Sequence, residues 1–312
     1  MKRLLLFFLS VMLIPIIIIN FFFNISNKIV TGFNQNLLDK KENIINIRVL
    51  KNDNTVENIN LEEYLIGVVS SEVPLYFEEE AIKAQTVASR TYALKQIENN
   101  KSNSYDVTDN TLSQVYSTND ELKEKWGNNY EENYNNVKRI IDDTKGEYIS
   151  YNNDYIYAFF FSTSNGYTED NKNVFGEDLP YLKSVESSFD KDENSSFEVE
   201  VLIDKSDFYN KLGINYSDSI SISNVSKSES NRILYLEING IGFKGREFQK
   251  LLGLRSNDFT ILDQGNTIKI TTKGYGHGVG LSQYGANALA KQNKNYIEIL
   301  KYYYKGTEIK KL

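Results

Sequence analysis

The stretch GYGHGVGLSQYGA, residues 274–286, is the most informative part of this sequence. Four of its first seven residues are glycine, and among them stands His277, the only histidine of the chain. Glycine allows positive φ angles and close approach of other groups, at an entropic cost that an ordinary loop avoids. The stretch lacks the Gly-Lys-Ser/Thr ending of a nucleotide-binding P-loop. It indicates a built site around an imidazole, and the apolar spacing that follows predicts a helix over 286–304 that anchors it.

The length and composition of the chain exclude several classes of ligand and site. A chain of 312 residues can form one large or two modest domains with a substantial core. The formal net charge of −7 and the lack of a basic block argue against nucleic acid as the main ligand. Cysteine is absent, which excludes disulfides, a thiol nucleophile and a cysteine-based zinc site.

The N-terminus has the pattern of a membrane anchor. Lys2 and Arg3 precede an uncharged apolar run over 4–23, close to the ~20 residues that cross a bilayer. The run has no small-residue cleavage signal, so we expect a retained single span rather than a signal peptide. The basic flank predicts a cytoplasmic tip at 1–3, a polar stalk at 24–42 and an extracytoplasmic domain at 43–312.

The exported part has early and late helices with strands between them. Strands are expected at 43–50 and 56–61, and helices at 61–69 and 78–97. Further strands at 197–203, 220–225, 234–238 and 267–272, with a helix at 243–251, predict a strand-rich sub-domain at about 197–272. Because strands and helices do not alternate regularly, the pattern favours an α+β fold, here a mixed helix/sheet domain with a substrate cleft.

Glu72 is the candidate catalytic residue. It follows Val68 and Val69 and precedes Val73 and Pro74, and an apolar setting raises the pKa of a carboxyl by desolvation. A carboxyl that keeps its proton near neutral pH can serve as a general acid. From the residues alone, the alternative of an exposed helix-end glutamate with an ordinary pKa is the simpler interpretation.

The predicted helix over 78–97 presents further candidates. Gln85 and Tyr92 border its stripe of small residues together, so we expect both to face one cleft. Arg90 lies about 140° around the helix from Gln85, so it reaches the same cleft only with help and is otherwise expected to hold a neighbouring loop.

Four motifs in order identify a family resemblance. With the glycine-rich stretch come EEYLIGVVSSEVP at 62–74 with AIKAQTVASRTYAL at 81–94, TDNTLSQVY at 108–116, and AFFFSTSNGYTE at 158–169. Together they span roughly residues 45–306. The sequence resembles the stage II sporulation protein D family, which carries the SpoIID/LytB domain.

The resemblance implies a lytic transglycosylase that acts on peptidoglycan. Glu72 would protonate the oxygen between N-acetylmuramic acid and N-acetylglucosamine, and then help the muramyl 6-hydroxyl attack the anomeric carbon. The implied substrate-binding residues are Gln85, Arg90, Tyr92, Ser113, Gln114, Tyr116, Ser162, Thr163, His277, Gln283 and Tyr284. For Tyr92 and for the named residues of 113–116 and 162–163 the alternative is turn formation or a place at the edge of the core. For His277 the alternative is fixing its own glycine loop.

One departure from the family concerns metal. Relatives commonly have histidine directly before the Ser-Thr-Ser run, and some bind zinc there through histidine and cysteine. In this chain Phe161 occupies that position and cysteine is absent. We therefore expect no zinc bound through the family's ligands and no cofactor.

The resemblance also implies a setting and partners. Related proteins prefer glycan strands from which an amidase has removed the stem peptides, so a sporulation amidase of the stage II sporulation protein P type and a membrane scaffold protein are expected partners. The implied location is the mother-cell membrane at the septum during engulfment. The alternative function is a non-catalytic glycan-binding modifier that stimulates a cell-wall amidase, as the LytB branch suggests.

Overall fold

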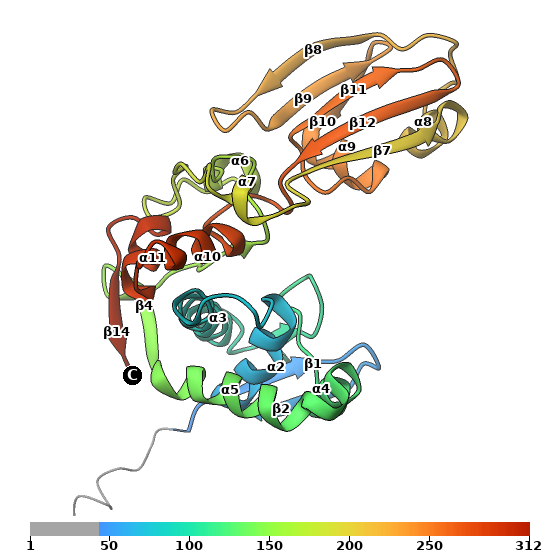
Figure 1. Cartoon of the computed structure of the whole chain (residues 1–312). Helices are drawn as coiled ribbons and strands as arrows, with labels where there is room; N and C mark the ends of the chain where they lie inside the picture. The colour runs from blue at the N-terminus through green and yellow to red at the C-terminus, as the bar shows by residue number, and fades with distance from the viewer. Residues whose placement is uncertain (1–43) are drawn as a thin grey trace, which may run out of the picture. The chain divides into compact units, whose positions relative to one another are not determined.

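The computed structural model describes residues 44–312 (Figure 1). The expected cytoplasmic tip (1–3), anchor (4–23) and stalk (24–42) lie outside these residues and stay predictions. Within 44–312 no helix combines the length and apolarity that a bilayer crossing requires. The described chain mixes helices with several small sheets, in agreement with the mixed class that the sequence favours.

The first sheet forms around β1. β1 (Asn46–Leu50) and β2 (Val56–Asn60) pair as an antiparallel hairpin, and β3 (Val107–Thr108) lies parallel to β1 on its other side. β2 leads directly into α2 (Leu61–Glu72), because the Asn60 side chain accepts hydrogen bonds from the first backbone N–H groups of the helix. The predicted succession of strand, strand and helix is confirmed here.

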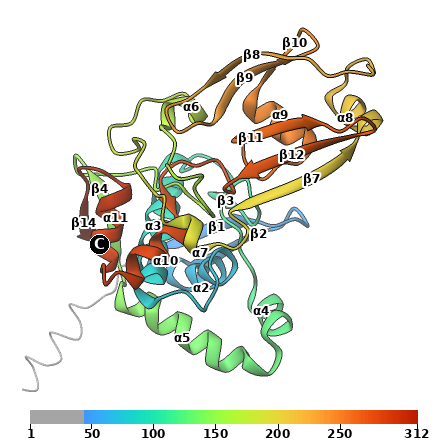
Figure 2. The same cartoon turned by 45° about the horizontal axis from the view of Figure 1, so that its top comes forward.

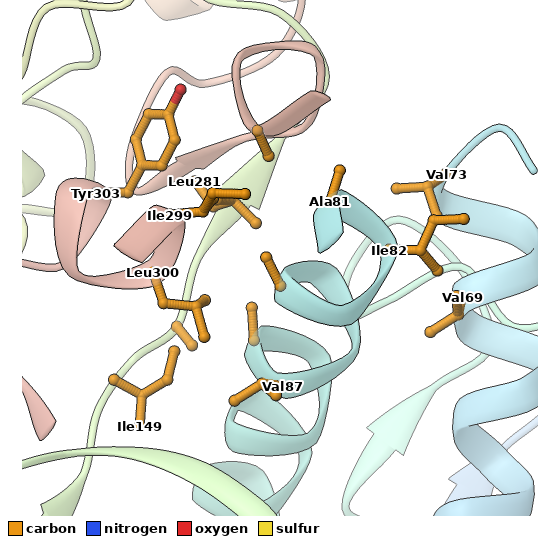
Figure 3. Close-up of a cluster of buried hydrophobic side chains, with 14 of the residues drawn as sticks. Val69, Val73, Ala81, Ile82, Val87, Ile149, Leu281, Ile299, Leu300 and Tyr303 are labelled. Carbon is orange, nitrogen blue, oxygen red and sulfur yellow. The ribbon is translucent and has the colours of Figure 1, made fainter. Parts of the chain in front are cut away.

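α3 (Glu79–Asn99) is the centre of the main hydrophobic core. Its small side chains Ala81, Ala84 and Ala88 are buried and let neighbouring elements approach closely. Figure 3 shows α3 between two groups of apolar side chains: Val69 of α2 with Val73 just after it, and Leu281, Ile299 and Leu300 from the C-terminal segments. The core thus joins the start and the end of the described chain.

A further helical layer covers α2. α4 (Asn119–Trp126) starts with a capping box at Thr118, and η1 (Gly127–Asn129) connects it to α5 (Tyr130–Asp143). α5 buries Val137, Ile140 and Ile141 and packs on α2 and α3.

The segments that complete the main core come before and after the strand-rich region in the sequence. β4 (Glu147–Tyr151), β5 (Asp154–Tyr155) and β14 (Glu308–Lys311) form a sheet in the order β14-β4-β5. β6 (Phe160–Phe161) pairs in parallel with β13 (Leu281–Ser282), and two short helices, α6 (Asn171–Phe175) and α7 (Asp190–Glu193), follow β6.

The predicted helix over 286–304 is two helices. α10 (Gln283–Lys291) ends before Asn293, which has a φ of 63°, and Asn295 caps α11 (Tyr296–Tyr303) with its side chain. Asparagine tolerates the left-handed conformation and is a strong helix cap, so this pair breaks the helix although the apolar spacing continues.

The strand-rich region has a hydrophobic core of its own. Figure 2 labels the strands of its two sheets. One sheet has the order β10-β9-β8 and the other β11-β12-β7. Their strands are β7 (Glu198–Asp204), β8 (Ile222–Lys227), β9 (Ile233–Ile238), β10 (Ile241–Lys244), β11 (Phe259–Asp263) and β12 (Thr267–Lys273). Two helices, α8 (Lys205–Leu212) and α9 (Gly245–Leu252), follow β7 and β10 and contribute Phe208 and Phe248 to this core. The predicted helix over 243–251 begins later than expected, because residues 243–244 complete β10.

Candidate active site

Glu72 is the last residue of α2, where Val73 turns the chain into an extended conformation ahead of Pro74. Its side chain is half-buried, and burial raises the pKa of its carboxyl above the ordinary 4.5. Two hydrogen bonds oppose this shift: the Val115 N–H donates to Oε1 at 2.8 Å, and the Gln283 side chain makes the other. Because desolvation outweighs both, the carboxyl keeps its proton to a higher pH than an exposed glutamate does.

The segment 108–117 lies so close to α2 that position 67 of this helix must be glycine. A Cβ atom on Gly67 would lie 2.3 Å from the Ser117 carbonyl oxygen and 2.5 Å from the Tyr116 ring. The Tyr116 ring also stacks on Tyr64, with ring centroids 5.2 Å apart. Gly67 therefore sets the distance between the segment and α2, and this distance brings the Val115 N–H to the carboxylate.

Tyr92 connects α3 to the same site. Its hydroxyl hydrogen-bonds Ser113, and after the larger effect of burial the charge of Glu72 helps to raise the pKa of Tyr92. Because Tyr92 is only 9% exposed, it presents no open ring face on which a bound molecule could stack. The structure thus brings Glu72, Tyr92 and Ser113 together.

Gln85 and Gln114 lie one layer deeper, each 1% exposed. Gln85 donates to the Ser89 hydroxyl at 3.0 Å, Gln114 donates to the Ser89 carbonyl at 3.4 Å, and the Tyr64 hydroxyl donates to Gln114 at 3.4 Å. These contacts link α2, α3 and the segment 108–117. Both amides are therefore closed off from solvent. We assign them to positioning α2, α3 and the segment 108–117 around Glu72 rather than to substrate contact.

Gln283 reaches Glu72 because the glycine-rich stretch folds tightly against β6. Gly280 has a φ of 80°, and a Cβ atom at this position would lie 2.0 Å from the Phe159 carbonyl oxygen. Only glycine combines this positive φ with so close an approach of a neighbouring carbonyl. Ser282 then caps α10 with its side chain and places Gln283 in the first turn of the helix.

Asp190 is a buried carboxylate that the sequence analysis missed. It is 0% exposed and accepts hydrogen bonds from the Ser164 N–H at 2.7 Å, from the Ser187 hydroxyl at 2.6 Å, and from the Ser282 hydroxyl. Burial raises the pKa of Asp190. It ties the turn after β6 to the start of α10. Its partners come from distant segments, so the run FDKDE (189–193) carries no local signal for this role.

Ser162 and Thr163 have different surroundings. Thr163 is fully buried, its hydroxyl accepts from Asn194 at 2.7 Å, and its backbone pairs with Tyr275. Ser162 is half-buried, and its carbonyl accepts a hydrogen bond from the Tyr284 N–H at 3.1 Å. Of these two residues, Ser162 is the one that is partly accessible.

Tyr76, which is exposed, and Tyr284, which is half-buried, form an aromatic edge next to Gln283, the side chain that hydrogen-bonds Glu72. Their hydroxyls lie 3.4 Å apart, Tyr76 is 77% exposed, and the Phe77 ring packs edge-on against Tyr284. Tyr76 comes four residues after Glu72 in the turn that follows α2, and Tyr284 follows Gln283 directly. The sequence analysis named Tyr284 and missed Tyr76, whose signal was an aromatic residue just past the S-E-x-P turn.

His277 lies among aromatic rings. Phe159, Phe161 and Phe175 surround it, and its Nδ1 accepts the Val279 N–H at 3.1 Å. Burial, followed by the charges of two nearby arginines, lowers the pKa of His277 to about 3. The imidazole is therefore neutral and fixes its own loop, and among the described residues no contact joins it to Glu72.

Arg90 points away from the carboxyl into a closed environment. Its guanidinium is 0% exposed and donates to the Glu62 carboxylate at 2.7 and 2.9 Å. It also donates to the carbonyls of Glu147 and Ile141. Its donors are thus engaged inside the protein, and we assign Arg90 to positioning: it fastens α3 to α2 and α5.

Metal ligands do not converge in the part of the chain that the structure describes. Residues 44–312 contain no group of three or more histidine, cysteine, aspartate or glutamate side chains that could hold a metal ion. Phe161, directly before the Ser-Thr-Ser run, packs on His277.

Comparison with known proteins gives consistent matches. A family model described as "Stage II sporulation protein" (SpoIID) matches residues 50–151. The chain is 41% identical over 275 residues to stage II sporulation protein D of Bacillus subtilis (strain 168), which covers 86% of this chain and 80% of that protein. The corresponding protein of Bacillus amyloliquefaciens is 40% identical over the same coverage. The amidase enhancer of B. subtilis is 28% identical over 299 residues, which covers 78% of this chain and 40% of that protein.

Proposed function

Because this sporulation protein belongs to the stage II sporulation protein D family, we propose that it is a membrane-anchored lytic transglycosylase of peptidoglycan. It cleaves the bond between N-acetylmuramic acid and N-acetylglucosamine in strands stripped of stem peptides, and it leaves 1,6-anhydromuramyl ends. The observation that carries this proposal is the half-buried Glu72 carboxyl, whose pKa is raised by desolvation at the meeting point of α2, α3 and α10.

In this mechanism one carboxyl acts twice. The Glu72 proton passes to the glycosidic oxygen as its bond to the muramyl anomeric carbon breaks. The carboxylate then takes the proton of the muramyl 6-hydroxyl while that oxygen bonds to the anomeric carbon, which restores the acid without consuming water. Val115 and Gln283 hydrogen-bond the carboxylate and stabilise its charged form between the two transfers.

The surroundings of Glu72 agree with a single-carboxyl scheme. Retaining and inverting hydrolases place two carboxylates at set separations across the bond. Among the described residues, the recorded partners of the Glu72 carboxyl are a backbone N–H and an amide, with no second carboxylate in contact. Tyr92, Ser113 and Ser162 supply hydroxyls, and Tyr76 and Tyr284 supply rings suited to pyranose faces.

The location and partners follow the same proposal. Residues 4–23 anchor the protein in the mother-cell membrane, residues 43–312 face the wall, and residues 197–272 form a sub-domain of that part. A sporulation amidase of the stage II sporulation protein P type prepares the strands, and a membrane scaffold protein holds both enzymes.

The test uses the full-length protein in detergent on purified glycan strands, with mass spectrometry of the new ends. We expect 1,6-anhydromuramyl ends from the wild type, none from Glu72→Gln, and retained strand binding by that variant. The matched control Glu79→Gln alters a half-buried glutamate at the start of α3, which pairs with Arg139 and Lys83, and should cleave normally. Reducing ends, or substantial cleavage by Glu72→Gln, would discard the single-carboxyl mechanism.

A second function is favoured by one observation, the relative named amidase enhancer. Under this alternative the chain binds glycan strands without cleaving them and stimulates an amidase. It predicts no new ends from either protein in the same experiment, with faster amidase cleavage when wild type or Glu72→Gln is added.

A further inference from the structure

Arg255 differs from the other arginines that the structure describes. Of the six arginines in 44–312, five donate hydrogen bonds from the guanidinium: Arg48 to Asp106, Arg90 to Glu62, Arg139 to Glu79, Arg232 to Asn257 and Arg246 to the Val174 carbonyl. The Arg255 guanidinium donates none to any described residue, and its Nε is shielded from solvent without a partner. This cation therefore has donors but no acceptor within 44–312.

The position of Arg255 is fixed from two sides. Its carbonyl accepts the Gly276 N–H at 2.9 Å, which holds its backbone against the glycine-rich stretch. Its guanidinium carbon lies 4.5 Å from the centre of the Tyr275 ring, and Tyr275 is 49% exposed. The ring holds the cation by a cation–π contact while the rest of the guanidinium stays available.

The backbone connects Arg255's partner Tyr275 to Tyr284: the Tyr275 N–H donates to the Thr163 carbonyl at 2.7 Å, and the Tyr284 N–H donates to the neighbouring Ser162 carbonyl at 3.1 Å. The charge of Arg255 lowers the pKa of the Tyr284 hydroxyl, but burial and Tyr76 outweigh it and raise that pKa to about 12. Tyr284 follows Gln283, the side chain that hydrogen-bonds Glu72. A bound strand that contacts the aromatic edge at Tyr284 therefore comes within the field of Arg255.

The chemistry of the substrate supplies the missing acceptor. Each muramyl residue carries a lactyl group, which is an amide while the stem peptide is attached and a free carboxylate once an amidase has removed the peptide. A guanidinium fork matches a carboxylate with two parallel charge-assisted hydrogen bonds, which an amide cannot accept in the same way. We propose that Arg255, held on Tyr275, binds the free lactyl carboxylate of a muramyl residue and so selects strands that an amidase has stripped.

This inference rests on the proposed function for its substrate, but it is tested by binding rather than by cleavage. The probe is the full-length chain carrying Glu72→Gln, so that strands are not consumed. Three ligands are compared: stripped strands, the same strands with lactyl carboxylates converted to methylamides, and strands with intact stem peptides. We expect the stripped strands to bind about tenfold more tightly than the methylamide form, with a smaller difference at high ionic strength.

Arg255→Gln on this background should remove the preference, and Arg255→Lys should keep part of it. The matched control is Arg246→Gln, which also loses an arginine stacked on an aromatic ring, Phe175, but one that already donates to a carbonyl. The control should keep the full preference, and thermal unfolding should show each variant to be folded. In the enzyme with Glu72 intact, Arg255→Gln should raise KM for stripped strands and leave kcat nearly unchanged.

Equal binding of stripped and methylamide strands, or a preference that survives Arg255→Gln, overturns the inference. Tight binding of strands with intact stem peptides that depends on Arg255 also overturns it, because the peptide carboxylates would then be the acceptor. An Arg255-dependent preference without any anhydro ends from the wild type would reject the transglycosylase and leave this inference standing. Cleavage to anhydro ends without a preference for stripped strands would reject this inference and leave the transglycosylase standing.

Discussion

The backbone N–H of Val115 donates a 2.8 Å hydrogen bond to Oε1 of Glu72, so the SQVY segment supports the candidate catalytic carboxyl directly. Burial still raises the pKa of Glu72 against this bond. Glu79, at the start of the next helix, shows the opposite balance: ion pairs with Arg139 and Lys83 lower its pKa to about 2. The two glutamates differ because desolvation dominates at one and ion pairing at the other.

The first prediction concerns pH. Because the pKa of Glu72 is raised on folding, the folded state binds more protons than the unfolded state between pH 4.5 and the raised value, and stability falls as pH rises through that window. Glu72→Gln removes this loss, so its gain in free energy of unfolding should grow across the window and then level off. Urea denaturation at a series of pH values measures it. Cleavage by the wild type should persist across this window and decline as the pH rises through the raised pKa, where the folded carboxyl loses its proton. An equal effect of Glu72→Gln on stability at all pH values would contradict the assignment.

The second prediction concerns the glycine-rich stretch. Gly280→Ala places a Cβ atom 2.0 Å from the Phe159 carbonyl oxygen at a φ of 80°, whereas Gly265→Ala meets nothing within 4 Å at a φ of 84°. The control should lose only the left-handed strain of about 1–2 kcal/mol. Gly280→Ala should lose a further ~1–3 kcal/mol from overpacking, together with cleavage, because the loop places Gln283. Urea denaturation of both variants gives the difference, and equal losses would show that the close approach is unimportant.

The sequence predicted the elements that depend on local patterns. The strands at 46–50 and 56–60 and the long helix from Glu79 were expected, because alternation and helical spacing are written into neighbouring residues. The break at Asn293 was not expected, since the apolar spacing runs through it. α5 was also missed, although it buries one face against α2 and α3.

In the site, too, features set by local sequence motifs were predicted, and features set by contacts between distant residues were not. Glu72, Tyr92, Ser113 and Gln283 were named from motifs, and the structure brings them together. The roles of Asp190 and Arg255 were not foreseen. Asp190 depends on partners from distant segments, and Arg255 is notable because its guanidinium has no acceptor among residues 44–312, and only the folded chain defines either fact. For the same reason burial changed the interpretation of Gln85, Gln114 and Arg90, whose residue types suit sugar binding equally well.

The third prediction separates positioning from substrate contact at Arg90. The guanidinium is fully buried against Glu62, so Arg90→Ala leaves an uncompensated carboxylate and should cost about 3–5 kcal/mol. The matched control Arg139→Ala removes a half-exposed pair with Glu79 and should cost about 0–1 kcal/mol. Thermal or urea unfolding compares the two. If Arg90→Ala instead keeps its stability and raises KM alone, Arg90 contacts the strand.

The fourth prediction uses the fact that the chain has a single histidine. Because the pKa of His277 is lowered from 6.5 to about 3, the folded state stays neutral where the unfolded state takes up a proton. The unfolded state then binds more protons below pH 6.5, so this group's contribution to stability is complete above that pH and is lost as the pH falls toward 3. The imidazole proton resonances should be the only histidine signals in the NMR spectrum, and they should not shift between pH 8 and pH 5. His277→Phe, which keeps a ring among Phe159, Phe161 and Phe175, should flatten the acid side of the stability curve. A titration midpoint near 6.5 would show that the imidazole is open to solvent and able to act on a bound strand.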